Sequence, residues 1–261
     1  MFYRLRAHVA RSEDAFCVHR CRQCMAHVSA KEIVINFPVY EANGRSFKNV
    51  LLRTATGGSL SVDDSKRVVV KALNKVTFEM KEGDRIGLVG HNGSGKSTLL
   101  RVLSGAYEPI SGSLEIDGRV ASMLNVWLGM NSDATGYENI FMRGTIMGLR
   151  PKQIAAMVDD ICEFADLGDY IYMPLRTYSS GMQMRLAFSV STSVSADIIL
   201  MDEWLSAGDA NFSEKAQHRL QRMLDNAKIF VVASHDENLI HRTCNKLMRL
   251  EHGNMVDYRA L

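Results

Sequence analysis

Hydrophobic and polar positions along the chain form strand-like and helix-like segments in alternation. Apolar or alternating runs between turn residues predict strands at 32–37, 68–70, 75–80, 85–89, 197–201 and 229–233. Apolar residues at helical spacing predict helices at 97–104, on either side of 148–151 within 137–167, and from Ser180 past Phe188. The polar residues at 54–66 predict a surface loop. Strands and helices that alternate around a glycine-rich loop predict an α/β domain with a largely parallel sheet.

Length and composition are compatible with such a domain. The 261 residues suffice for one large domain or two small ones, and 46% apolar with 23% charged residues are typical of a globular protein with a sizeable core. The first 24 residues are rich in Arg, His and Cys and show no sustained period. We therefore expect residues 1–24 to be a disordered or non-native extension, with Met25 as the natural start, and residues 25–261 to form the folded domain.

Charge and hydropathy narrow the classes of partner. The formal net charge is +2 and no long basic run occurs, so the composition gives no case for nucleic acid. No apolar run approaches the roughly 18 residues that span a bilayer, so a role at a membrane would place the chain on one face. Five cysteines, an odd count without a secretory leader, indicate a reducing, cytoplasmic compartment.

Cys17, Cys21 and Cys24 lie close together, and His27 follows them. Thiolate and imidazole are preferred donors for zinc. The spacing nevertheless matches no paired CxxC pattern, and the stretch lacks the turn glycines of a small zinc fold. Metal binding and a tail without any ligand both stay open for this segment.

A glycine-rich loop follows the apolar run at 85–89. In order, it contains Gly90, His91, Asn92, Gly93, Ser94, Gly95, Lys96 and Ser97, with Thr98 directly after them. This phosphate loop satisfies G-x-x-x-x-G-K-[ST] between a strand and a helix, the context in which such loops bind phosphates. Its glycines let successive N–H groups face one point at a helix N-terminus. We expect Lys96 to reach the β- and γ-phosphates of a nucleotide and the Ser97 hydroxyl to join a magnesium shell.

Two carboxylates follow the apolar strand at 197–201. In open parallel sheets, ligands bind at the C-terminal ends of the strands. Asp202 is therefore predicted to hold Mg²⁺, directly or through water, and Glu203 is predicted to activate the attacking water as general base. With the phosphate loop, these residues establish a nucleotide site but leave open the kind of machine that uses it.

The segment 178–187, called the signature segment below, reads Tyr-Ser-Ser-Gly-Met-Gln-Met-Arg-Leu-Ala and narrows the class. It resembles the signature motif of the ABC ATPases, Leu-Ser-Gly-Gly-Gln followed by an arginine. Ser179, Gly181 and Arg185 match that motif, whereas the residues on either side of Gly181 depart from it. Hydroxyl and N–H groups at the start of a helix suit a γ-phosphate.

The resemblance implies a fold, a nucleotide and a partner. The fold is a P-loop NTPase (RecA-like) core with a small antiparallel β subdomain and an inserted α-helical subdomain at about 128–194. The ligands are ATP and Mg²⁺. The partner is a second copy of the chain, because in this family the Ser179 position of one copy contacts the ATP that the other copy holds.

Other positions resemble further elements of the family. Ser206–Asp209 is similar to the loop that crosses the dimer interface, which assigns Asp209 to the nucleotide site. Ser234–Asp236 is similar to the switch that brings a histidine, here His235, to the γ-phosphate. The family's N-terminal aromatic residue, which stacks on adenine, corresponds to Tyr40, with Phe37 as a rival.

One element of the family pattern is missing. ABC ATPases usually carry a glutamine that senses magnesium after the phosphate-loop helix, but the stretch 119–127 contains none. Asn125 is the nearest amide, and we expect it to make the magnesium contact in place of the glutamine.

Further segments resemble one branch of the family, the ATPases that export polysaccharides such as O-antigen and capsule. They lie at 25–28, 36–40, 135–140, 178–182 and 204–209. This resemblance implies an ATP-hydrolysing subunit that moves lipid-linked polysaccharide across the inner membrane. Such a subunit is peripheral, on the cytoplasmic face, beside an integral membrane permease. Some members add a C-terminal carbohydrate-binding domain, for which we expect no room after His241.

Alternatives stay open at this point. The chain could energise export of teichoic acid, capsule or a lipid. It could also be a soluble ABC-type ATPase of translation or repair, although those usually have two cassettes or a long coiled-coil insertion. A non-transport P-loop enzyme is disfavoured by the signature segment.

Overall fold

A computed structural model describes residues 25–38, 60–62, 68–202 and 210–261. The predicted N-terminal extension at 1–24, with its three cysteines, lies outside the described residues. So do Tyr40, Glu203 and the segment Ser206–Asp209. The description below therefore applies to the two sheets, the helices and the loops that join them.

One sheet is antiparallel, with strand order β2-β3-β1-β5. Its strands are β1 (His27–Pro38), β2 (Leu60–Val62), β3 (Val68–Lys81) and β5 (Ser111–Asp117). The two strands predicted at 68–70 and 75–80 are one continuous strand, β3. The prediction of a loop at 54–66 is wrong at 60–62, because β2 pairs there with the start of β3. Pairing between strands overrides the polar character of this segment.

The second sheet has the order β10-β9-β4-β8-β7-β6. Its strands are β4 (Arg85–Val89), β6 (Val120–Ser122), β7 (Ile198–Asp202), β8 (Ile229–Ala233), β9 (Lys246–Glu251) and β10 (Asn254–Ala260). Every neighbouring pair is parallel except β9 with β10. The central strands are buried along their length, as their apolar runs predict. The predicted α/β fold with a largely parallel sheet is confirmed.

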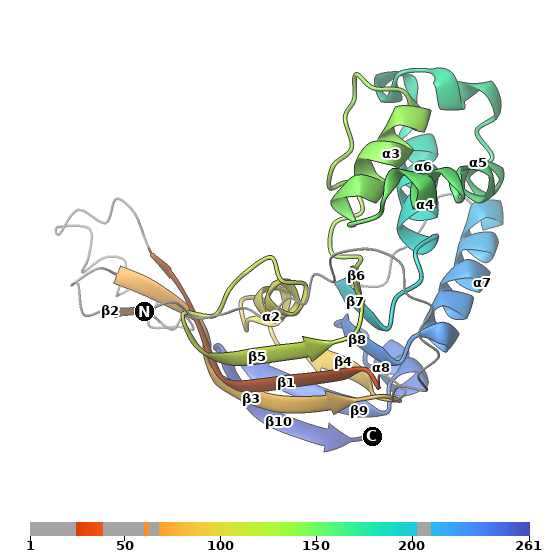
Figure 1. Ribbon diagram of the computed structural model, residues 1–261. Helices are drawn as coiled ribbons and strands as arrows, with labels where there is room; N and C mark the ends of the chain where they lie inside the picture. Colours follow the sequence, from red (N-terminus) through yellow and green to blue (C-terminus); the bar gives the residue numbers. More distant parts are fainter. Residues whose placement is uncertain (1–24, 39–59, 63–67, 203–209) are drawn as a thin grey trace, which may run out of the picture.

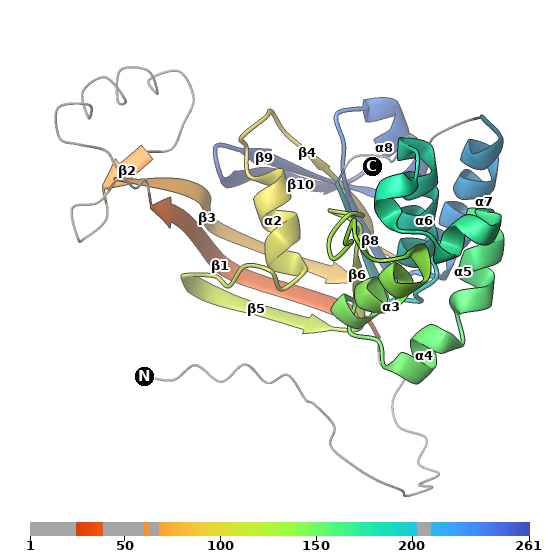
Figure 2. The ribbon, with the colours of Figure 1, turned by 90° about the horizontal axis from the view of Figure 1, so that it is seen from above.

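Helix α2 (Lys96–Leu103) begins inside the phosphate loop and packs against both sheets (Figures 1 and 2). Leu99 and Leu100 are fully buried in a core that both sheets share. Burial of this face fixes where the helix begins, and therefore where the phosphate loop lies relative to the ends of the strands.

A group of helices stands apart from the sheets (Figure 1). It comprises α3 (Gly136–Ile146), α4 (Pro151–Ala155), α5 (Val158–Ala165), the 3₁₀ turns η1 (Gly168–Tyr172) and η2 (Leu175–Thr177), and α6 (Ser180–Thr192). These elements enclose a core of their own, which includes Ile140, Ile161 and Leu186. The second helical stretch predicted within 137–167 is divided into α4 and α5. This inserted group is the helical subdomain expected above, and its limits at 128–194 stay a prediction.

Two helices that the sequence pattern did not predict cover the far side of the parallel sheet. They are α7 (Ala210–Asn226) and α8 (Glu237–Thr243). Apolar residues of α7, among them Leu220 and Leu224, pack with β7 and β8 in a second core. In the part of the chain described here, no helix is long and apolar enough to cross a membrane.

Candidate nucleotide site

A cleft of about 530 Å³ opens at the C-terminal ends of β4, β7 and β8. It is lined by Phe37, Val70, Lys71, Ala72, Asn92, Gly93, Gly95, Lys96, Ser97, Thr98, Leu124, Asp202, Ala233, Ser234 and His235. The cleft thus brings together the phosphate loop, the end of the strand at 198–202 and the predicted switch histidine. These segments are far apart in the sequence and meet because their strands are parallel neighbours.

The glycines of the phosphate loop are required by its backbone. Gly90 has a φ of 151°, and a Cβ there would lie 2.2 Å from the carbonyl oxygen of Leu250. Gly95 has a φ of 109°, and a Cβ would lie 2.6 Å from the carbonyl oxygen of Ala72. Only glycine adopts these conformations in so little space. Gly95 is also the N-cap of α2 and provides no side-chain hydrogen bond to the helix, so the N–H groups at this end suit an anion.

Lys96 is folded onto the phosphate loop. Its Nζ donates hydrogen bonds to the carbonyl oxygens of Gly90, at 2.6 Å, and His91, at 3.2 Å, and the residue is 8% exposed. The ammonium is thereby held over the mouth of the loop rather than in solvent. A positive charge beside a nest of N–H groups is the donor set that a nucleotide's phosphates require.

Ser97 and Asp202 meet across the cleft. The Ser97 hydroxyl donates a hydrogen bond to Asp202 Oδ2 at 2.7 Å. Among the described residues no group of three or more acidic, His or Cys side chains gathers to hold a metal. A hydroxyl with one carboxylate suits Mg²⁺ all the same, because this ion takes few protein oxygens and completes its shell with phosphates and water.

Strand β7, which ends in Asp202, is anchored at its beginning by Asp197. The Asp197 carboxylate accepts a hydrogen bond from the Arg119 N–H at 2.9 Å and pairs with Lys228 at 3.1 Å. The hydrogen bond from the Arg119 backbone and then the Lys228 ammonium lower the pKa of Asp197 below its usual value. This anchor ties β7 to β6 and to the start of β8.

The switch segment after β8 is held by its own short hydrogen bonds. Ser234 Oγ accepts the N–H of Asp236 at 3.0 Å, and Asp236 caps α8 by accepting the N–H groups of Asn238 and Leu239. His235, which lies between Ser234 and Asp236, is exposed and lines the cleft. The local turn therefore fixes the backbone and leaves the imidazole available to a ligand.

The aromatic and amide predictions have different outcomes. Phe37 lines the cleft and packs edge-on against Tyr107, with ring centroids 5.5 Å apart. Its rival Tyr40 lies outside the described residues. Asn125 is exposed and does not line the cleft. Its Oδ1 accepts the N–H of Trp127 at 3.0 Å. Leu124, the residue before it, faces the cleft instead, and the magnesium contact of Asn125 stays a prediction.

The signature segment does not line this cleft. Ser179 is the N-cap of α6, and its Oγ accepts the N–H of Met182 at 3.2 Å. Gly181 is half-buried, and a Cβ there would approach only Ser179 Oγ, at 3.9 Å. No contact within the described part of the chain thus requires glycine at this position.

The sequence patterns missed a turn that supports the phosphate loop. Between β9 and β10, His252 and Gly253 have φ values of 48° and 81°. The Gly253 N–H donates to the carbonyl oxygen of Ser94 at 2.9 Å, and the rings of His91 and His252 lie 4.5 Å apart. A His-Gly-Asn sequence signals a turn. Its contact with the phosphate loop has no local signal, because the two segments are distant in the sequence.

The fold and the cleft define a P-loop ATP-binding cassette. Residues 73–206 match the ABC transporter family, and the chain belongs to this family, whose cassettes bind and hydrolyse ATP. The dimeric ATP-binding cassette MJ0796 superposes with a TM-score of 0.64 in a post-hydrolysis structure bound to ADP and Pi and 0.63 in another dimeric structure. The first comparison shows 20% identity and the second 19%, and each covers 90% of this chain and 98% of the other.

Three relatives are export ATP-binding proteins. The O-antigen export system ATP-binding protein RfbE of Yersinia enterocolitica is 42% identical over 88% of this chain and 96% of its own. The O-antigen export system ATP-binding protein RfbB of Myxococcus xanthus is 38% identical over 85% of this chain. The teichoic acids export ATP-binding protein TagH of Bacillus anthracis is 37% identical over 72% of this chain. The matched regions cover 51% of the Myxococcus protein and 34% of the Bacillus protein.

Proposed function

We propose that this chain is the ATP-hydrolysing subunit of an exporter that moves lipid-linked polysaccharide of the O-antigen kind across the inner membrane. The observation that carries the proposal is 42% identity over nearly the whole length of an O-antigen export ATP-binding protein. The residues that line the cleft supply the chemistry that such a subunit needs.

The residues of the cleft divide the work between phosphate, metal and water. The phosphate loop and Lys96 would hold the β- and γ-phosphates, and Ser97 with Asp202 would hold Mg²⁺. The ion supplies charge neutralisation on the phosphates. Glu203 follows Asp202 directly, and we assign it the general base that takes a proton from water. His235 would contact the γ-phosphate from the end of β8.

A second copy of the chain would complete each site. Ser179 and Gly181 present a helix N-terminus, a hydroxyl and an open surface, yet they lie away from the chain's own cleft. The matched structures of MJ0796 are dimers. We infer that the signature segment of one copy closes over the ATP of the other and that Asp209 lies at this interface.

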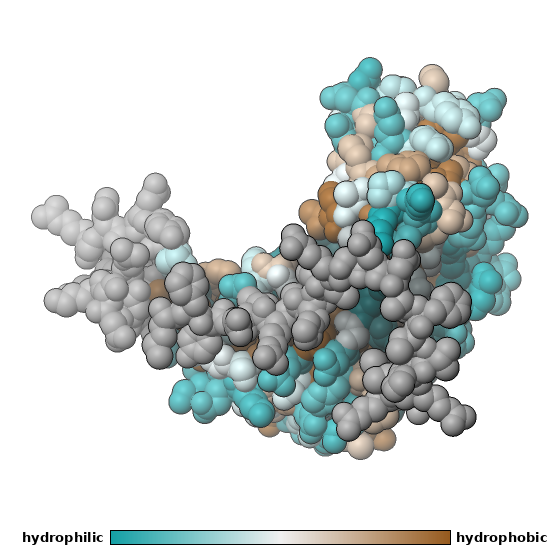
Figure 3. Space-filling view, in the orientation of Figure 1, coloured by the Kyte–Doolittle hydropathy of each residue, from teal (hydrophilic) through white to brown (hydrophobic). Residues whose placement is uncertain are grey.

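The helical subdomain offers a surface for the permease. A shallow apolar groove is lined by Asn131, Asp133, Ala134, Tyr137, Glu138, Phe141 and Met142. Tyr137 stacks on the exposed ring of Tyr172 beside it, at 6.3 Å between centroids. Hydrophobic residues come to the surface over this part of the molecule in Figure 3. We assign the groove to an integral membrane permease, which would hold the chain peripherally on the cytoplasmic face.

Reconstituted vesicles that contain the chain and its permease test the function. We expect ATP-dependent movement of an undecaprenyl-linked glycan, and no movement with the Lys96→Ala variant. Movement of a teichoic acid polymer but of no O-antigen-like glycan would contradict the proposal. That outcome would favour the second candidate function, teichoic acid export, which is supported by the 37% identity with the Bacillus protein.

Co-purification tests the permease surface. Tyr172→Ser should weaken retention of the permease, whereas Ile110→Ser should not. Both side chains are strongly exposed, at 68% and 64%, but Ile110 precedes β5 on the antiparallel sheet, away from the groove. Equal retention by the two variants would contradict the assignment of the groove.

A further inference from the structure

Three phenylalanines from three helices form a cluster where the helical subdomain meets the parallel-sheet core. Phe164 lies on α5, Phe188 on α6 and Phe212 on α7. Their ring centroids are 6.2 Å apart for Phe164 and Phe188, 5.5 Å for Phe164 and Phe212, and 5.9 Å for Phe188 and Phe212. Aromatic pairs at these separations favour particular ring orientations beyond simple burial. The cluster therefore fixes how the three helices lie relative to one another.

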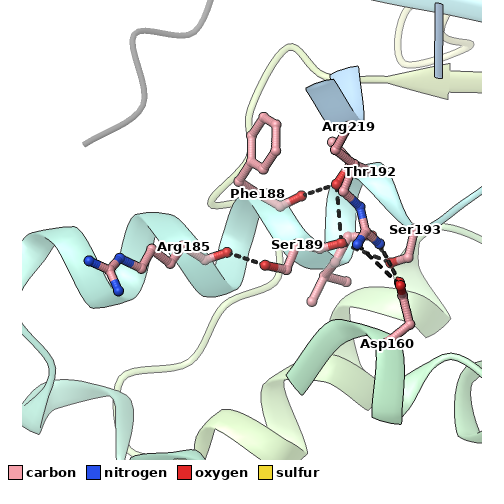
Figure 4. Close-up of polar contacts among 8 residues, drawn as sticks. Asp160, Arg185, Phe188, Ser189, Thr192, Ser193 and Arg219 are labelled. Carbon is pink, nitrogen blue, oxygen red and sulfur yellow. Dashed lines mark hydrogen bonds and ion pairs between the residues drawn. The ribbon is translucent and has the colours of Figure 1, made fainter. Parts of the chain in front are cut away.

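Arg219 of α7 closes this cluster from one side. Its guanidinium lies 4.4 Å from the centre of the Phe164 ring. Both terminal nitrogens bond the Asp160 carboxylate of α5, Nη1 with Oδ1 at 3.3 Å and Nη2 with Oδ2 (Figure 4). The Arg219 side chain is only 10% exposed, whereas the Asp160 side chain is 61% exposed. The guanidinium is thus held against the helical subdomain by a two-pronged ion pair and a ring face together.

Three hydroxyls near the end of α6 donate hydrogen bonds to carbonyl oxygens of their own helix. Ser189 Oγ donates to the carbonyl oxygen of Arg185 at 2.6 Å, and Thr192 Oγ1 donates to that of Phe188 at 2.9 Å (Figure 4). Ser193 Oγ donates to the carbonyl oxygen of Ser189 at 2.9 Å. Hydroxyls that bond their own helix tend to bend it and give it no tie to a neighbour. This end of α6 is tied to its neighbours by the Phe188 ring, which packs with Phe164 and Phe212, and by the Ser191 hydroxyl, which accepts a hydrogen bond from Arg143 of α3 at 2.8 Å.

The helices joined here carry the two parts of the composite site. The N-cap of α6 is Ser179, the residue assigned to the γ-phosphate of the partner's ATP. α7 follows the sequence segment that contains Glu203 and Asp209. A change in the angle between α6 and α7 would therefore displace the signature segment relative to the catalytic residues of the same copy.

We propose that Arg219, Asp160 and Phe164 are positioning residues. They set the orientation of α6, and with it that of the signature segment, for ATP-driven pairing of two copies. None of the three lines the nucleotide cleft, and they act through α5, α6 and α7. The inference rests on the proposed function, because it presupposes that a second copy completes the site.

Three variants test this assignment, all in a Glu203→Gln background that slows hydrolysis. Asp160→Asn removes one charge from an exposed side chain and keeps its size and shape. Arg219→Met keeps an apolar stem over Phe164 but loses the fork and the charge. Arg222→Met is the matched control, because Arg222 lies on the same helix and lines the same small cleft as Arg219 but is exposed.

Two quantities are measured for each variant: the Kd for MgATP of the dilute monomer, and the dimer dissociation constant at saturating MgATP. We expect the monomer's Kd to stay within about twofold, and dimerisation to weaken about tenfold in Asp160→Asn and Arg219→Met, as for loss of one charged contact. Arg222→Met should dimerise as the parent does. Thermal unfolding shows that each variant is folded under the conditions of the assay.

The outcomes separate the two proposals. If the parent protein does not dimerise with ATP, the composite site fails and this inference fails with it. If the parent dimerises but Asp160→Asn and Arg219→Met dimerise equally well, only the positioning role is overturned. An equal loss in Arg222→Met, or a matching loss of monomer MgATP affinity, would also overturn it, because the effect would then be general rather than local to the ion pair.

Discussion

The phosphate loop and the signature segment use similar residues in opposite surroundings. Both place glycine and serine at a helix N-terminus. A Cβ on Gly90 would meet the backbone of another strand at 2.2 Å, whereas one on Gly181 would meet only a neighbouring hydroxyl at 3.9 Å. Contacts within the chain therefore require glycine at position 90. At position 181 they do not, and the space beside Gly181 is open to a ligand or a second copy. The comparison teaches that one half of the site is built within the chain and the other half awaits a partner.

The largest effect should come from Lys96→Ala in the phosphate loop. Removing the ammonium that faces the phosphates should lower ATP turnover by about 10²–10³-fold, the usual consequence of losing one electrostatic donor. Turnover is measured as phosphate release from the assembled transporter. Lys152→Ala, on the exposed face of α4, is the control and should be unaffected. A Lys96→Ala variant with near-normal turnover would remove the phosphate loop from the mechanism.

Gly181→Asp should separate activity from folding most clearly. A carboxylate in the first turn of α6 interacts favourably with the helix dipole, so the free energy of unfolding should be unchanged or slightly higher. The same charge would face the partner's γ-phosphate, and turnover should fall about 100-fold. MgATP binding by the monomer should persist, as measured by titration calorimetry. Loss of monomer binding would contradict the view that this segment serves the other copy.

Gly90→Ala should do the reverse and damage the fold. The positive φ and the approach of Leu250 should lower the free energy of unfolding by about 1–3 kcal/mol. Chemical denaturation of the purified chain measures this value. Gly181→Ala is the matched control and should raise stability by up to about 1 kcal/mol, since alanine favours a helix. Equal stabilities for the two alanine variants would erase the contrast between the two segments.

The smallest effect should come from Phe37, the candidate for stacking on adenine. Phe37 lines the cleft and is 38% exposed. If its ring stacks on adenine, Phe37→Leu should weaken ATP binding about tenfold, since base stacking on an aromatic ring contributes about 1–3 kcal/mol. Inorganic triphosphate should bind both forms equally. An unchanged ATP affinity, with a loss in Tyr40→Leu, would transfer the role to Tyr40.

The local sequence pattern was enough to predict those strands, loops and helices whose determining residues lie within a few positions of one another. The strand at 85–89, the phosphate loop and the helix at 97–104 were predicted nearly to their ends, because glycines, a lysine and buried leucines act on the chain where they stand. The apolar runs at 197–201 and 229–233 were predicted for the same reason. By contrast, β2 and α7 escaped prediction. The former depends on pairing with β3, and the latter carries many charges on its exposed face.

The sequence alone determined that this chain binds ATP and belongs among the ABC ATPases, because the phosphate loop and the signature segment are each a run of consecutive residues. Only the tertiary structure decided which segments meet. Ala72 and the turn at Gly253 support the phosphate loop, Leu124 rather than Asn125 faces the cleft, and the signature segment lies away from it. These contacts join residues distant along the chain, and their positions follow from strand order and helix packing rather than from any local pattern.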